Sequence, residues 1–120
     1  MSRRLAPVNI HSKVWLEREG RVALSAWRIA LLEAVHEAGS LAAAAERIGV
    51  PYRTAWYKLR EIEDQLRLPL LDTQSGGPDG GHSTLTPEAL DIVRRFRRAS
   101  RGVEDLVRER FESEFPELTR

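Results

Sequence analysis

Two short helix-like runs around a Gly-Val-Pro turn constrain the fold of this 120-residue chain more than any other feature. The first run follows Ser40, a residue type that caps helix N-termini well, and Gly49 supplies the positive φ that ends it. Pro51 stands near the first position of the second run, where its missing N–H costs no hydrogen bond. We therefore predict two helices, over residues 41–48 and 51–66, joined by a sharp turn.

The second of these helices has an apolar face and an opposite face of arginine and aromatic residues. At about 100° per residue, Ala55, Leu59 and Ile62 share the inner face. The outer set consists of Arg53, Trp56, Tyr57 and Arg60. A helix with such an outer face suits the major groove of DNA, where arginine pairs with guanine or phosphate. For this segment alone, a helical hairpin with a solvated polar face is an equally good interpretation.

Two further elements precede this helix pair. Alternating apolar residues around Glu19-Gly20 predict a β-hairpin over residues 13–24. A capping serine and a terminating glycine then enclose a predicted helix over residues 26–38. The apolar residues of this helix cover more than one helical stripe, and Arg28, Glu33 and Glu37 lie outside the apolar surface. We therefore expect the helix to be buried on two sides.

Two more elements follow the helix pair. A glycine-rich loop between two extended runs predicts a second hairpin, a wing, over residues 70–86. Thr86-Pro87-Glu88 is a strong helix start, and the final helix is predicted over residues 87–115. The predicted fold is therefore mainly α with small β-hairpins: a winged helix–turn–helix with an N-terminal hairpin and a long C-terminal helix.

Composition limits the class of protein. Apolar residues make up 42% and charged residues 31% of the chain, which is typical of one globular domain, here residues 1–120. No apolar run is long enough to cross a bilayer, so no membrane partner is expected. Cysteine is absent, which excludes disulfide scaffolds and is compatible with a cytoplasmic location.

The charge is unevenly distributed although the net charge is only +1. Three basic and six acidic residues from Glu104 to Arg120 give −3, and the other sixteen basic and twelve acidic residues give +4. Of the 19 basic residues, 17 are arginine, a residue suited to bidentate phosphate and guanine contacts, although codon bias explains the excess equally well. This distribution is compatible with a nucleic-acid face without establishing one.

The sequence offers no support for catalysis. His11, His36 and His82 stand in three separate predicted elements, without the spacing of metal ligands. The glycine-rich run lacks the Lys-Ser/Thr of a phosphate-binding loop, and no nucleophile motif is present. We therefore expect no enzyme activity, no metal and no cofactor.

Several motifs follow one another between about residues 15 and 96: VWLE in the first hairpin, RIALLEAVHEAGS, VPYRTAW at the turn, a glycine-rich wing and LTPEAL. This ordered set resembles the N-terminal winged-helix domain of the molybdate-dependent transcriptional regulators, the ModE type. LysR-type regulators are more distantly similar and share the GSL-x-AAA and LT landmarks. The resemblance covers about two-thirds of the chain.

The resemblance implies a transcriptional regulator that binds double-stranded DNA at a palindromic operator as a homodimer. It places one set of residues nearest the DNA: Pro51, Tyr52, Arg53, Trp56, Tyr57 and Arg60. In the wing, the polar candidates are His82, Ser83 and Thr84. The long last helix would supply much of the dimer interface with a stripe of apolar residues, although packing within the monomer is an alternative for the same stripe: Val93, Phe96, Val103, Val107 and Phe111.

The sequence departs from the resemblance in two ways. Members of the family carry a C-terminal oxyanion-binding domain, and this sequence ends at Arg120 without one, so we expect a regulator or fragment without that sensor and identify no effector. Asp79 stands at the wing tip, where a basic residue would suit phosphate better. The alternative is a winged helix used for protein–protein contact, which the salt dependence of duplex binding would distinguish.

Overall fold

The computed structural model describes residues 5–74 and 82–119, so the predicted glycine-rich wing tip with Asp79 lies outside the described residues. The chain divides into two compact units. We call Val14–Ala99 the main unit, and Met1–Lys13 with Ser100–Arg120 the terminal unit. The sequence predicts a single domain over residues 1–120, and this domain assignment stays a prediction.

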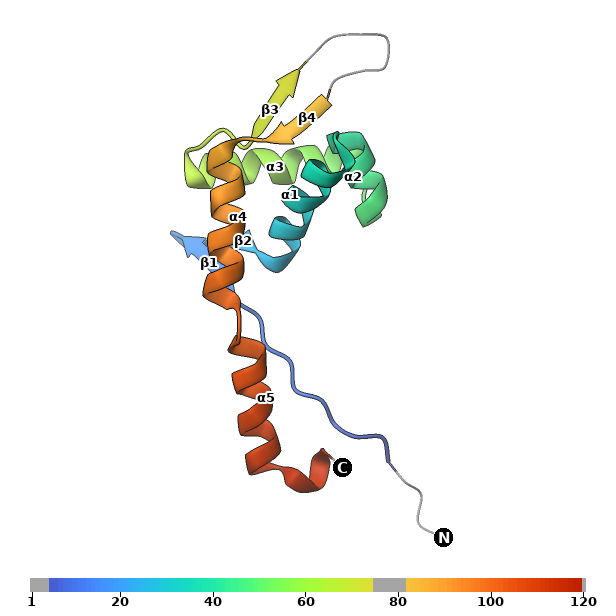
Figure 1. The fold of residues 1–120 in the computed structure, drawn as a ribbon, viewed down its shortest axis with the longest axis vertical. Coiled ribbons are helices and arrows are strands. Elements are labelled where there is room, and N and C mark those ends of the chain that lie inside the picture. Colours follow the sequence, from blue (N-terminus) through green and yellow to red (C-terminus); the bar gives the residue numbers. More distant parts are fainter. Residues whose placement is uncertain (1–4, 75–81, 120) are drawn as a thin grey trace. The chain divides into compact units, whose positions relative to one another are not determined.

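The described elements confirm the predicted fold class, which is mainly helical with two small antiparallel hairpins (Figure 1). The main unit contains, in chain order, β1 (Trp15–Arg18), β2 (Arg21–Ser25), α1 (Ala26–Ala38), α2 (Leu41–Ile48), α3 (Tyr52–Leu66), β3 (Leu71–Gln74), β4 (His82–Leu85) and α4 (Pro87–Ser100). The terminal unit contains α5 (Val103–Glu114) and the 3₁₀ turn η1 (Pro116–Leu118).

The helix–turn–helix is formed by the caps that its sequence specifies. Ser40 Oγ accepts a hydrogen bond from Ala43 N–H at 3.1 Å and so caps α2. Gly49 ends α2 with φ +84°, and its N–H donates to Ala45 O at 2.9 Å. α3 begins two residues after Val50, so the turn between the helices is short and conformationally defined.

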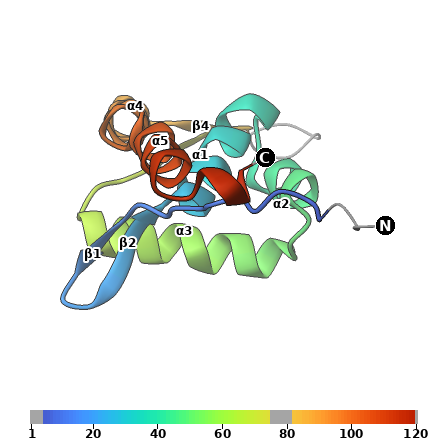
Figure 2. The ribbon, with the colours of Figure 1, turned by 90° about the horizontal axis from the view of Figure 1, so that it is seen from below.

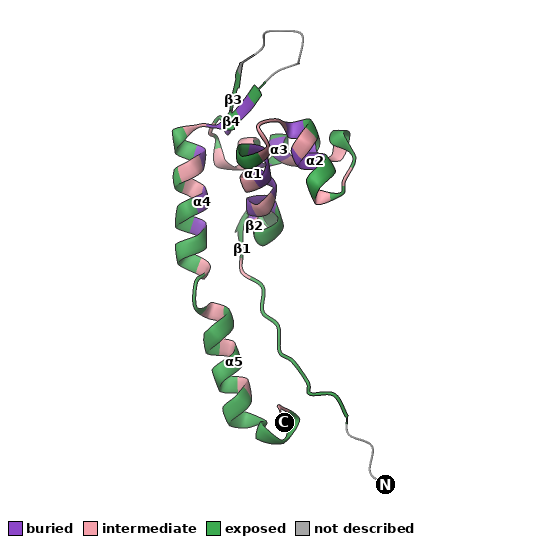
Figure 3. Cartoon of the chain, turned by 45° about the vertical axis from the view of Figure 1, so that its right-hand side comes forward, coloured by how far each residue is buried: buried purple, intermediate pink, exposed green. Residues whose placement is uncertain are grey.

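Helix α1 forms the centre of the hydrophobic core. Ile29, Leu31, Leu32 and Val35 are fully buried in it. Figure 2 shows α3 along one side of the main unit, α4 on the opposite side and α1 between them. Buried residues therefore lie on α1 and on the inner faces of its neighbours, as the purple segments of Figure 3 show.

Arg28 of α1 corrects the prediction made for that helix, because it is buried and not outside. Only 8% of the residue is exposed. Its guanidinium lies against α3, where it pairs with Glu61. The helical pattern could not show this, because the partner that compensates the buried charge comes from another helix.

The wing is attached to the helix–turn–helix at its base. β3 pairs with β4 in antiparallel register, with Leu71 opposite Leu85. The Ser83 N–H of β4 donates to Gly39 O at 2.8 Å, which fixes the wing to the turn between α1 and α2. Thr86 caps α4 by accepting from Ala89 N–H at 3.1 Å and donates to Pro69 O at 2.8 Å.

The helix predicted over residues 87–115 is interrupted, which is a second correction. α4 ends at Ser100 and α5 begins at Val103, after Gly102 in the left-handed region with φ +83°. A glycine can adopt this conformation at low cost, and it breaks the helical hydrogen-bond pattern. Val93 and Phe96 of α4 are buried, whereas no residue of α5 is (Figure 3).

Within residues 5–74 and 82–119, no helix has both the length and the apolar character needed to cross a membrane.

Candidate nucleic-acid interface

The outer face of α3 carries a shallow groove of about 360 Å³ that is open to solvent. Four side chains line it: Tyr52, Arg53, Trp56 and Tyr57. All four residues are exposed, while Ala55, Leu59 and Ile62 on the opposite face are buried in the core. The structure therefore separates the predicted inner and outer sets of this helix as the sequence indicates.

The aromatic residues of this face are held by contacts along the helix. The rings of Trp56 and Tyr57 meet edge to face, with centroids 5.3 Å apart. Arg60 Cζ lies 4.9 Å from the centroid of the Trp56 ring, a cation–π contact. Arg60 Nη1 is also 3.6 Å from Glu63 Oε1. The Arg60 guanidinium thus lies over Trp56 and next to a carboxylate on the same helix.

The N-terminus of α3 has no side-chain cap. Pro51 occupies the N-cap with φ −60° and ψ 146°, and it makes no side-chain hydrogen bond to the first turn. The first N–H groups of a helix have no intrahelical partner and lie at the positive end of its dipole. Next to exposed Arg53, they give this end of α3 a donor-rich surface suited to an anion.

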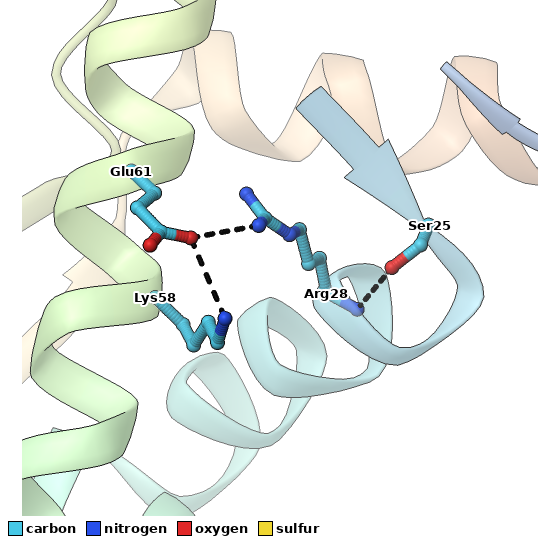
Figure 4. A network of polar contacts seen from close by, with 4 residues as sticks. All are labelled: Ser25, Arg28, Lys58 and Glu61. Carbon is cyan, nitrogen blue, oxygen red and sulfur yellow. Dashed lines mark hydrogen bonds and ion pairs between the residues drawn. The ribbon is translucent and has the colours of Figure 1, made fainter. Parts of the chain in front are cut away.

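A polar network holds α3 against α1 (Figure 4). Arg28 Nη2 donates to Glu61 Oε2 at 2.8 Å, and Lys58 Nζ lies 3.6 Å from the same oxygen. At the other end of Arg28, its backbone N–H donates to Ser25 Oγ at 3.2 Å as part of the N-cap of α1. The network therefore connects the N-terminus of α1 to Lys58 and Glu61 on α3.

The wing residues predicted to approach DNA are not equivalent in the structure. His82 and Thr84 are exposed, whereas Ser83 is only 8% exposed. Successive residues of a strand point to opposite faces, and Leu85 is buried with Ser83. Ser83 is therefore not available at the surface, and its prediction as a contact residue is corrected. The strand alternation visible in the sequence was the signal that this prediction overlooked.

Sequence reasoning also missed Glu63. Glu63 Oε2 accepts from Leu70 N–H at 3.0 Å, directly before the wing, while Oε1 faces Arg60. Glu63 thus connects the base of the wing with the outer face of α3. The signal was available in the sequence, because Arg60 and Glu63 are spaced i, i+3 on one helix.

No metal site is found in the part of the chain that the structure describes, where no three His, Cys, Asp or Glu residues come together to hold an ion. His82 instead lies beside the turn after α1. A Cβ added at Gly39 would be 3.5 Å from His82 Nδ1.

Comparison with known protein families identifies the family to which this chain belongs. Residues 27–90, more than half of the chain, match the family model of the bacterial regulatory helix–turn–helix proteins, lysR family. The chain therefore belongs to that family. It is a DNA-binding helix–turn–helix domain of the transcription-regulator type, and it is related to the molybdate regulators, as the individual relatives show.

The chain is 34% identical over 94 residues to the molybdenum-pterin-binding protein MopB of Rhodobacter capsulatus, which covers 78% of this chain and 34% of that protein. It is 33% identical over 86 residues to the molybdenum transport protein ModE of Azotobacter vinelandii, covering 72% and 32% respectively. The chain thus spans about a third of the length of these relatives.

The fold itself is also found in a solved structure. The chain superposes on the BenM DNA-binding domain, from a crystal structure of its complex with catB site 1 DNA, with a TM-score of 0.52. The superposition covers 68% of this chain and 84% of that one, at 20% identity. At this identity the likeness establishes the shared fold alone.

Proposed function

We propose that this domain regulates transcription by binding a palindromic operator as a homodimer, with α3 in the major groove. The observation that carries the proposal is the outer face of α3, where arginine and aromatic side chains stay exposed around a groove while the opposite face is buried. A helix presented in this way fits the width of the major groove. A cytoplasmic location, where a bacterial operator is accessible, is part of the proposal.

Each part of the proposed interface has its own role. Arg53 and the uncapped start of α3 would contact phosphate or guanine. Pro51 sets the entry into the helix, while His82 and Thr84 are the exposed wing residues that would approach the backbone. The groove on the outer face of α3 would face the base edges.

We propose the homodimer because the apolar side chains of α5 are incompletely buried. None of its residues is buried, Leu106 is 48% exposed, and Val103, Val107 and Phe111 are only half-buried. A helix of 12 residues is marginal in water without packing partners. A second copy of the chain would cover this surface and, by two-fold symmetry, present two α3 helices to half-sites about 34 Å apart.

Selection from a random duplex pool tests DNA reading. We expect a palindromic motif whose affinity falls by about 10³–10⁵ between 50 and 200 mM salt if 6–10 phosphates are contacted. Arg53→Ala should weaken the selected duplex by about 1–3 kcal/mol. Arg98→Ala, an exposed arginine on α4, is the matched control and should leave binding unchanged. Absence of binding to any duplex at low salt would favour the protein-interaction alternative, which the small net charge of +1 supports.

Sedimentation analysis tests the dimer separately. Leu106→Glu should shift the protein to monomer, because it places a charge on the surface proposed to be covered. Leu16→Glu on β1 is the control, since Leu16 is 46% exposed and Leu106 48%. Equal effects of the two substitutions, or a wild-type monomer at concentrations that saturate the palindrome, would contradict the role of α5.

A further inference from the structure

We infer that the aromatic groove on α3 recognises a thymine by its C5-methyl group, and that Trp56 is the residue that determines this specificity. The inference rests on the proposed function, in which α3 lies in the major groove. It adds the identity of the base that the groove on α3 selects. It also gives different roles to Trp56, which contacts the base, and Arg60, which positions Trp56, although the sequence places both on one face.

The lining of the groove is complementary to the edge of thymine. Tyr52, Trp56 and Tyr57 contribute aromatic surface, and Arg53 contributes a charged donor. In the major groove, only thymine displays an apolar group, its methyl, and it displays the O4 acceptor beside that methyl. Aromatic surface next to N–H and O–H donors matches both features.

The other bases match this lining less well. Adenine and cytosine present amino donors in the major groove, and the lining contains no carboxylate or amide oxygen to accept from them. Only the tyrosine hydroxyls can accept there. Guanine presents two acceptors that suit Arg53, but no apolar group that would use the aromatic rings. Guanine is thus the competing occupant that an experiment must distinguish.

Apart from Tyr57, the neighbours that hold Trp56 in position do not line the groove. Arg60 lies over its ring at 4.9 Å, and Glu63 Oε1 is 3.6 Å from Arg60 Nη1. The other carboxylate oxygen of Glu63 accepts from Leu70 N–H at 3.0 Å, so Glu63 is anchored outside the outer face of α3. Arg60 therefore acts as a positioning residue that holds the ring, and not as a residue that reads a base.

Replacing single groups on the bases of the DNA tests the inference. In the duplex selected from the random pool, each thymine is replaced in turn by deoxyuridine, which removes only the methyl group. At one position per half-site, we expect the wild-type protein to lose about fourfold in affinity, the equivalent of about 0.8 kcal/mol for one buried methyl. Trp56→Ala should bind the thymine and deoxyuridine duplexes equally.

A second pair of variants tests the positioning role of Arg60. Arg60→Met should reduce the difference between thymine and deoxyuridine, because the ring loses its cation partner, and Arg60→Lys should restore part of it. A role of Arg60 in phosphate binding would instead weaken both duplexes equally. Circular dichroism of each variant verifies folding, and Trp56→Gln, which keeps a long side chain but has no aromatic ring, replaces Trp56→Ala if the latter does not fold.

The outcomes separate the two proposals. A wild-type protein that binds no duplex overturns the proposed function. A protein that binds its palindrome but is indifferent to every deoxyuridine substitution overturns thymine recognition alone, as does a Trp56→Ala variant that keeps the wild-type sensitivity. Loss of binding on 7-deazaguanine substitution, with deoxyuridine neutral, would assign the groove to guanine through Arg53.

Discussion

Removing the two partners of the Arg28–Glu61 ion pair should affect folding unequally, because one partner is buried and the other is not. The side chain of Arg28 is 10% exposed and that of Glu61 is 52% exposed. Arg28 Nη2 donates to Glu61, whereas Nη1 is buried with no hydrogen-bond partner among the described residues. The guanidinium therefore depends on Glu61, whereas the carboxylate of Glu61 is half-exposed to solvent and also lies 3.6 Å from Lys58 Nζ.

The magnitudes follow from this asymmetry. Glu61→Ala leaves a buried charge without its carboxylate, and we expect a loss of about 2–3 kcal/mol, below the 3–5 typical of a fully buried pair because water screens the exposed half of Glu61. Arg28→Met removes one charge-assisted bond but also removes the unpartnered Nη1, and its unbranched chain retains much of the packing. The net cost should stay within about 1 kcal/mol.

Urea unfolding followed by circular dichroism measures both variants and the double variant. The double variant should resemble Arg28→Met, because without the guanidinium the loss of Glu61 leaves nothing buried and unpaired. Thermal unfolding gives a second measure, since 2–3 kcal/mol corresponds to about 10–20 °C in a unit of this size. The reasoning would be refuted if Arg28→Met cost as much as Glu61→Ala, or if the two losses were additive in the double variant.

Substitutions at three further positions have defined expectations. Gly49→Ala should destabilise the chain by about 1–2 kcal/mol because φ at this position is +84°; no steric clash adds to this, since nothing lies within 4 Å of the new Cβ. In thermal unfolding, Gly49→Asn should recover part of the loss, because asparagine tolerates positive φ better than alanine. Equal Tm values for the two variants would contradict this expectation. Ile62→Ala, at a fully buried site, should cost about 2–5 kcal/mol in urea unfolding, and a smaller loss would indicate that α3 closes the cavity. Arg47→Ala removes an exposed ion pair with Glu37 and should cost less than about 1 kcal/mol, a difference that salt should reduce further.

The bounds of α1 and α2 could be predicted because local signals specify them. Ser25 and Ser40 cap their helices with side-chain hydrogen bonds, and Gly39 and Gly49 end them with positive φ. Each of these effects acts within one turn of the chain. The inner face of α3 was predictable for a related reason, since helical periodicity alone places Ala55, Leu59 and Ile62 together.

What failed in the prediction depended on contacts between elements. A helical wheel assigns Arg28 to the polar side of α1. Its burial is compensated by the ion pair with Glu61, which lies on another helix, α3. The Arg60–Trp56 contact is likewise a matter of side-chain conformation that residue spacing permits but does not specify. These contacts stabilise the candidate site. The sequence therefore predicted which residues form the outer face of α3, but not the contacts that hold them in position.

The break between α4 and α5 changes how the apolar stripe of the last helix should be understood. The sequence presents Val93, Phe96, Val103 and Val107 as one continuous face, but Val93 and Phe96 are 7% and 5% exposed within the core of the main unit. Those two residues are therefore not free for a partner. If a second copy is bound through the C-terminal helices, it has to be bound through α5, where Leu106 is exposed. Leu106→Glu should then abolish the dimer without lowering the unfolding free energy of the main unit.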